Sequence, residues 1–145
     1  MSVTDAKQAR RVVQLMVLAA WADGHVAGSE ALTIQKLVTG VPMLDGVGPI
    51  AELSRDTRAR MMEEGMDECV IAAATGLRDR EYKELAFQCC ARVTGADSVF
   101  AAEEEEFLRK LQQLFALTAD DMRRLLVLAS PGTAGAPPAS SKSGR

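Results

Sequence analysis

The chain carries one acidic phrase twice. ADGHVAGSE runs from Ala22 to Glu30, and ADSVFAAEE runs from Ala96 to Glu104. Each copy has an aspartate in second place, an apolar side chain three positions later and a glutamate seven positions later. At the same offset of 74 residues the flanking apolar positions also correspond, and the pairs are Met16 and Cys90, Ala19 and Val93, Val26 and Phe100, Ile34 and Leu108, Leu37 and Leu111, and Val41 and Phe115. Matching core positions of this kind predict one helix-turn-helix unit used twice.

The rest of the chain also has helical periodicity. The segment from Asp5 to Ala22 is apolar nearly all round, which is typical of a helix at the centre of a bundle. Further helices are predicted from near Gly28 to Val41, from Ile50 to Glu64 as one or two helices, from Asp67 to Thr75, from Asp79 to Thr94, from Ala102 to Phe115, and after Thr118, which caps TADDMRRLLVLA. GVPMLDGVGPI is expected to be a loop. No alternating strand pattern appears, so the predicted class is all-α.

Composition predicts a single helical domain over residues 1–130. Of 145 residues, 48% are hydrophobic and 26% are charged, which suffices for a sizeable core. The Pro-, Gly- and Ser-rich stretch 131–145 cannot bury a core and is expected to be a disordered tail. A net charge of -3 with 4% aromatic residues disfavours nucleic acid as a partner. Three cysteines without a CxxC pair or a signal peptide indicate reduced thiols in a cytoplasm, and no apolar run is long enough for membrane insertion.

The acidic phrase has two interpretations. In the structural one, Glu30 and Glu104 lie near the third position of their helices, where the helix dipole and free backbone N–H groups favour a carboxylate. Asp23 and Asp97 then close turns by accepting hydrogen bonds from nearby backbone N–H groups. In this case the phrase only makes a stable turn between helices.

The second interpretation is a site for a hard cation. Four carboxylates brought together repel one another unless a cation or protons offset their charge, and oxygen ligands suit Ca²⁺, Mn²⁺ or Mg²⁺. Each turn alone offers too few ligands, but a pseudo-twofold pairing of the two units would place both turns on one side of the domain. An EF-hand fits poorly, because Gly24, His25 and Val26 break the alternation of ligands after Asp23.

In the first copy an Ala-rich helix is followed by the spacing Asp-Gly-x-Val-x-x-x-Glu. The copies lie in the stretches LAAWADGHVAGSEALTIQKL and GADSVFAAEEEEFLRKLQQLF. The spacing resembles the tellurite-resistance TerB family and the TerB-like domain of membrane-anchored DnaJ-like proteins. The resemblance implies about seven helices in two pseudo-symmetric helix-turn-helix halves, and a role in bacterial stress responses. It also implies a metal-binding acidic cluster, whose matching positions here are Asp23, Glu30, Asp97 and Glu104. The second copy departs from the pattern, since Ser98 stands where the first has Gly24.

No catalytic constellation is apparent, and no enzyme activity is expected. The only histidine, His25, has Val99 as its counterpart and is expected to be an exposed turn residue. Cys89 and Cys90 are expected to be core thiols. The predicted function is a cytoplasmic module that binds one divalent cation and acts through protein partners, membrane-associated stress-response proteins among them. The alternative is a metal-free helical interaction module whose acidic turns are only structural.

Overall fold

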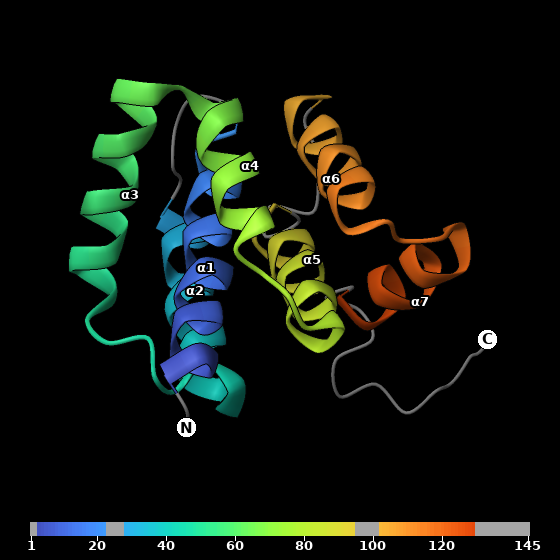
Figure 1. The fold of residues 1–145 in the computed structure, drawn as a ribbon, viewed down its shortest axis with the longest axis horizontal. Helices are drawn as coiled ribbons and strands as arrows, with labels where there is room; N and C mark the ends of the chain where they lie inside the picture. Colours follow the sequence, from blue (N-terminus) through green and yellow to red (C-terminus); the bar gives the residue numbers. More distant parts are fainter. Residues whose placement is uncertain (1–2, 23–27, 95–101, 130–145) are drawn as a thin grey trace.

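The computed structural model describes residues 3–22, 28–94 and 102–129, with side chains described over 4–22, 34–94 and 105–126. This part of the chain forms seven α-helices and one 3-10 helix, and contains no strand (Figure 1). The elements are α1 (Val3–Ala20), α2 (Gly28–Gly40), η1 (Pro42–Leu44), α3 (Ile50–Glu64), α4 (Met66–Thr75), α5 (Arg80–Thr94), α6 (Ala102–Phe115) and α7 (Ala119–Ala129). The predicted all-α class is therefore confirmed. The predicted tail at 131–145 lies outside the described residues.

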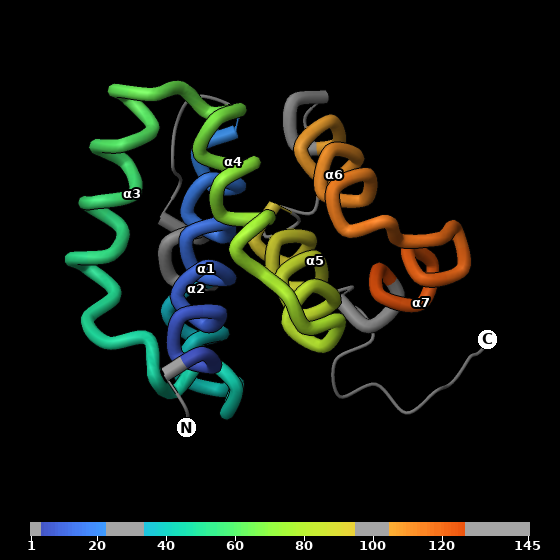
Figure 2. The backbone as a smooth tube through the Cα atoms, viewed as in Figure 1, coloured from blue at the N-terminus to red at the C-terminus, as the bar shows by residue number. Residues whose placement is uncertain are grey.

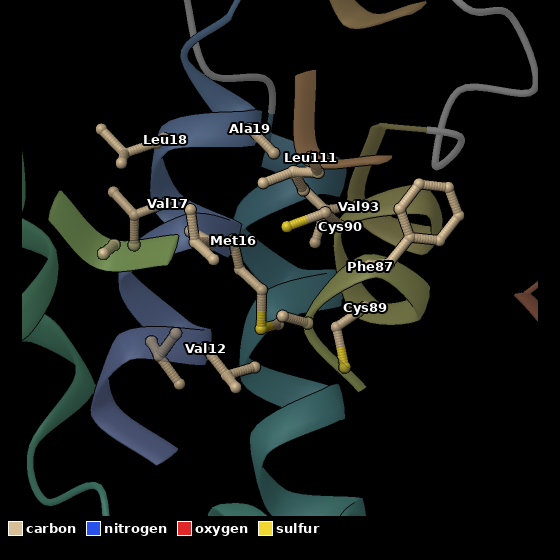
Figure 3. Packing of buried hydrophobic residues seen from close by; sticks show 14 of the residues in the cluster. Val12, Met16, Val17, Leu18, Ala19, Phe87, Cys89, Cys90, Val93 and Leu111 are labelled. Atoms are coloured by element: carbon tan, nitrogen blue, oxygen red, sulfur yellow. The ribbon is translucent and has the colours of Figure 1, made fainter. Parts of the chain in front are cut away.

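Helix α1 is at the centre of the bundle, as its apolar composition predicted. Helices α2, α3, α4 and α5 and the 3-10 helix all pack against it. Its buried hydrophobic side chains are Ala9, Val12, Val13, Leu15, Met16, Val17, Leu18, Ala19 and Ala20. Figure 3 shows Val12 and Met16 in the same cluster as Phe87, Cys89 and Cys90 of α5. Helices α6 and α7 pack on α5, so α1 and α5 are the two helices around which the others are arranged.

At the 74-residue offset, the two predicted units share the end of their first helix and the start of their second. Helix α1 ends at Ala20 and α5 ends at Thr94, while α2 begins at Gly28 and α6 begins at Ala102. The corresponding apolar positions are also buried in both units, and the described pairs are Met16 with Cys90, Ala19 with Val93, Ile34 with Leu108, and Leu37 with Leu111. Val41 is half-buried where Phe115 is buried. Val26 and Phe100 lie outside the described residues. The pattern of apolar residues thus predicted the buried positions and the starts of α2 and α6, whereas α1 ends at Ala20, two residues before the predicted Ala22.

The segment between the two units departs in detail from the prediction. Ile50 to Glu64 forms a single helix, and the expected loop before it contains a 3-10 turn with Leu44 and Val47 buried. Helix α3 ends at Gly65, whose φ of +98° belongs to a region that favours glycine. The Gly65 N–H donates to the Met61 carbonyl, 2.8 Å away. The chain reverses there, so that α4 runs antiparallel to α3 (Figure 2).

A buried glutamine ties α1 to the turn between α4 and α5. The Gln8 side chain is only 2% exposed. Its Oε1 atom accepts hydrogen bonds from the backbone N–H groups of Arg78 and Asp79, each at 3.0 Å, and its Nε2 donates to Asp79 Oδ2 at 3.0 Å. Asp79 in turn accepts backbone hydrogen bonds that start α5, from the N–H groups of Tyr82 and Lys83. Gln8 therefore fixes where α5 begins relative to α1.

Thr118 caps α7, as predicted, and does so reciprocally with Asp121. The Asp121 N–H donates to Thr118 Oγ1 and the Thr118 N–H donates to Asp121 Oδ2, both at 3.0 Å. Arg80 Nη2 also donates to Asp121 Oδ2, at 2.6 Å, and joins α7 to the start of α5. The Thr118 hydrogen bonds, with Arg80, lower the pKa of the Asp121 carboxyl to about 2.

No helix in the described part of the chain is long and apolar enough to cross a membrane.

Replacing Gln8 with leucine is expected to lower the free energy of unfolding by about 2 kcal/mol, because two backbone N–H groups lose their shared acceptor. Urea denaturation of the two proteins measures the difference. Gln14→Leu is the matched control: Gln14 is half-buried and accepts one hydrogen bond from Arg11, so its loss should cost less than about 1 kcal/mol. Equal effects of the two substitutions would contradict the role given to Gln8.

The Asp121 carboxylate is expected to stabilise the fold in a pH-dependent way. Because its pKa is about 2 in the folded chain and 3.8 ordinarily, its contribution is complete above about pH 4 and is lost as the pH falls through about 2. The difference in urea midpoint between the wild-type chain and Asp121→Asn should therefore shrink across this range. The control is Asp120→Asn, because the Asp120 side chain is 88% exposed and its ion pair with Arg123 lies on the surface. A difference for Asp121→Asn that does not change with pH would refute the assignment.

Candidate functional site

The four carboxylates predicted as cation ligands fall largely outside the described residues. Asp23 and Asp97 lie in the stretches 23–27 and 95–101, outside the described backbone, and so does His25. Glu30 is the third residue of α2 and Glu104 is the third residue of α6, which are the helix positions predicted for them. Their side chains lie outside the described set. The convergence of the four carboxylates therefore stays a prediction.

The chain leaves α1 through a tight turn. The Trp21 N–H donates to the carbonyls of Val17 and Leu18, at 3.2 and 3.1 Å, and the Ala22 N–H donates to the Ala19 carbonyl at 3.2 Å. This turn leads directly to Asp23, the next residue in the sequence. The first acidic phrase thus begins from a point that is fixed by backbone hydrogen bonds to the end of a buried helix.

A pocket of about 420 Å³ lies beside this turn. Ala22 lines it together with the start of α4, which includes Met66 and Asp67, and with the α6 residues Glu106 and Phe107. The end of the first helix of one unit and the second helix of the other unit therefore border the same hollow. In the sequence, Ala22 directly precedes Asp23, and Glu106 lies two residues after the second acidic phrase.

The described side chains around this pocket have mixed charge. Asp67 Oδ1 forms an ion pair with Lys110 Nζ, which links α4 to α6, and Arg109 also lines the pocket. Glu106 is exposed. Among the side chains that the structure describes, no three from His, Cys, Asp and Glu gather as metal ligands do.

Trp21 has a second role that the sequence did not indicate. It is half-buried against the core at the end of α1, as expected for a residue that packs a helix end. It also lines a cavity of about 410 Å³ with Ile34, Ile50 and Arg58. The guanidinium carbon of Arg58 lies 5.8 Å from the centroid of the Trp21 ring, within cation–π range. This contact could not be predicted from the sequence, because Trp21 and Arg58 are far apart in the chain and no local pattern connects them.

The three cysteines are buried thiols, as predicted for Cys89 and Cys90. Burial raises the pKa of Cys89 to about 12 and raises that of Cys90 well above its ordinary value. The pKa of Cys69 is also raised, chiefly by burial. A thiol of this kind is protonated at neutral pH and is a poor nucleophile or metal ligand. These side chains serve the packing of the core.

Comparisons of the chain with protein-family models, with curated proteins and with solved structures find no match. The resemblance to the TerB family stays a prediction from the two acidic phrases. A functional proposal for this chain therefore rests on its own residues and their geometry.

Proposed function

We propose that this chain is a TerB-like stress-response module of the bacterial cytoplasm, which binds a divalent cation through its two acidic phrases and acts through partner proteins. Asp23, Glu30, Asp97 and Glu104 are the proposed ligands, and Ca²⁺, Mn²⁺ and Mg²⁺ are the cations that such oxygen ligands suit. The observation that carries the proposal is that the Asp and the Glu have the same positions relative to the helix ends in both units, which we call equal register. In each, the Asp follows the end of the first helix by three residues and the Glu is the third residue of the second helix.

Equal register matters because it makes both units present their carboxylates in the same way. The helix ends correspond at the same offset as the acidic phrases, and the buried faces of α1 and α5 correspond as well. A pseudo-twofold relation between the units is part of the proposal. It is supported by the packing of α1 on α5, which places the first helices of the two units in contact.

The pocket at the end of α1 supports a shared site in place of two separate ones. Ala22 and Glu106 line it together, although 84 residues separate them in the sequence. The pocket thus brings the end of α1 and the first half of α6 to one space. The two acidic phrases, which adjoin these helix ends in the sequence, are proposed to meet on this side of the domain, where a cation would offset their mutual repulsion.

The cation would act by joining the two helix-turn-helix units. Without it, four carboxylates at one end of the bundle favour separation of the two turns. With it, the turns are held together, and the surface they form has a different charge and shape. We propose that protein partners, including membrane-associated stress-response proteins, recognise this surface. The proposal includes no catalysis.

A metal-free helical interaction module is the second candidate, and the position of the two glutamates favours it. A Glu at the third position of a helix can accept hydrogen bonds from free N–H groups of the first turn, and it interacts favourably with the helix dipole. Glu30 and Glu104 both occupy this position. The two candidates differ in one measurable respect, which is whether the stability of the domain depends on divalent cations.

Titration of the chelator-treated chain with Ca²⁺, Mn²⁺ and Mg²⁺ is expected to show saturable binding for at least one cation. A cation at a hundred times its dissociation constant should add about 2.7 kcal/mol to the stability of the folded state and raise its melting temperature. Asp23→Asn and Asp97→Asn should each abolish the shift, because both turns contribute ligands. Calorimetry measures the binding, and thermal unfolding followed by circular dichroism measures the shift.

Asp45→Asn is the matched control, since it removes the same charge by the same chemical change from an exposed residue at the end of η1. It should bind and melt as the wild-type chain does. If no cation produces heat or a melting shift at millimolar concentration, the cation site is refuted and the metal-free module remains. Loss of binding in only one of the two aspartate variants would refute the shared site.

A further inference from the structure

A strongly basic cleft lies near the start of α1, beside the turn between α4 and α5. Its volume is about 620 Å³. Five cationic side chains line it, which are Lys7, Arg10, Arg11, Arg60 and Arg78. No carboxylate is among the described residues that line it. In a chain with a net charge of -3, this concentration of positive charge is local and not a consequence of composition.

The cations of this basic cleft retain donors for a ligand. Arg10 Nη1 donates to the Val47 carbonyl at 2.8 Å, and Arg11 Nη1 donates to Gln14 Oε1 at 3.0 Å. Arg60 pairs with Glu64 at 3.4 Å on the exposed surface. Each guanidinium has five N–H donors, so one such contact leaves others available. Within the described residues, no ion pair involves Lys7 or Arg78.

The fold positions these cations with two specific contacts. Gln8 holds the backbone of the α4–α5 turn, which carries Arg78. Gly76, at the end of α4, lets the Arg11 side chain lie against the backbone. A Cβ atom at Gly76 would come within 2.8 Å of Arg11 Nε. The cleft is therefore a built feature in which one residue lacks a side chain so that a guanidinium can fit.

A small recess adjoins the basic cleft. It has a volume of about 20 Å³, and Arg11, Gln14 and Arg60 line both the recess and the cleft. Thr57 of α3 also lines the recess and is only 6% exposed. Its Oγ1 atom has no hydrogen-bond partner in the described structure. Since buried hydroxyls are nearly always hydrogen-bonded, this one points to a polar group that enters from the cleft, and the recess has room for one oxygen atom.

We propose that the basic cleft binds a phosphate-bearing ligand with more than one phosphate group. Arg11, Arg60 and Arg78 donate charge-assisted hydrogen bonds to its oxygens, and Lys7 and Arg10 add positive charge. One ligand oxygen reaches the Thr57 hydroxyl in the recess. The number of cations favours a di- or triphosphate over a single carboxylate, and the volume matches that of small-molecule sites. The site is formed around the first half of α1, whereas the acidic phrase follows its other end.

Inorganic pyrophosphate is the first probe, titrated calorimetrically into the full chain. The chain is expected to bind pyrophosphate saturably. Arg78→Ala is expected to weaken this binding about tenfold, and Lys7→Ala is expected to weaken it less. Both variants change exposed side chains. Arg92→Ala is the matched control, because Arg92 is exposed on α5 and lies apart from the cleft. It should change the affinity less than about twofold. An equal loss of affinity in the control would overturn the proposal, and so would the absence of saturable binding both to pyrophosphate and to the anionic vesicles described below.

Two further variants test the geometry without changing the net charge. Gly76 has helical φ and ψ, so Gly76→Ala leaves the backbone unstrained but displaces Arg11, and it should weaken pyrophosphate binding several-fold while the circular dichroism is unchanged. Thr57→Val removes the buried hydroxyl. It should raise the stability of the free chain, because an unpartnered buried hydroxyl is costly, and should weaken pyrophosphate binding. Unchanged affinity in both variants would refute the site as described.

The source of the phosphate is decided by a second experiment. The chain is mixed with phosphatidylcholine vesicles that contain or lack cardiolipin, a lipid whose headgroup has two phosphates, and cosedimentation is measured. Binding to the anionic vesicles that Arg78→Ala abolishes and Arg92→Ala does not would assign a lipid phosphate to the cleft. Binding of pyrophosphate without binding to vesicles would assign a soluble phosphate ligand. If neither probe binds in a way that depends on Arg78, the phosphate site is excluded.

Discussion

The packing of α1 against α5 is the contact on which the rest of the structure depends. Both helices are buried along most of their length, and the other helices pack around this pair. Helices that are covered on nearly every side have little room for polar function along their length. In α1 the described charged side chains all lie in its first half, and they are Asp5, Lys7, Arg10 and Arg11. The basic cleft uses this half, and the first acidic phrase follows the other end of the helix in the sequence.

Much of the fold could be predicted from the sequence because its helices are local. The 3.6-residue periodicity indicated each α-helix, and the repeat indicated the two units. The structure adds that their first helices end at matching positions, Ala20 and Thr94, although the predicted end of the first was Ala22. The 3-10 turn at Pro42–Leu44 was not predicted. Its Gly and Pro residues indicate a loop, whereas the burial of Leu44 depends on contacts with distant helices that a local pattern does not contain.

The candidate sites differ in the same way. The acidic phrases are short, continuous segments, so their repetition is visible in the sequence. The basic cleft is assembled from α1, from α3 and from the α4–α5 turn, and its cations span positions 7 to 78. No spacing rule connects Lys7 with Arg60 or Arg78. Only the close approach of Arg11 to Gly76, and the orphaned Thr57 hydroxyl, show that these cations surround a formed cavity.

The distribution of charge along α1 has a further consequence. Lys7 and Arg11 lie in its first half, beyond the first turn, whose acidic residue is Asp5, and Asp23 follows its last turn in the sequence. The two proposed sites therefore take ligands of opposite charge near the two ends of one helix. Because the apolar side chains of α1 are buried from Val12 to Ala20 and five other elements pack against it, it cannot shift at one end without disturbing the other. If a cation at one end and a phosphate at the other both alter its position, each must change the affinity for the other by the same factor.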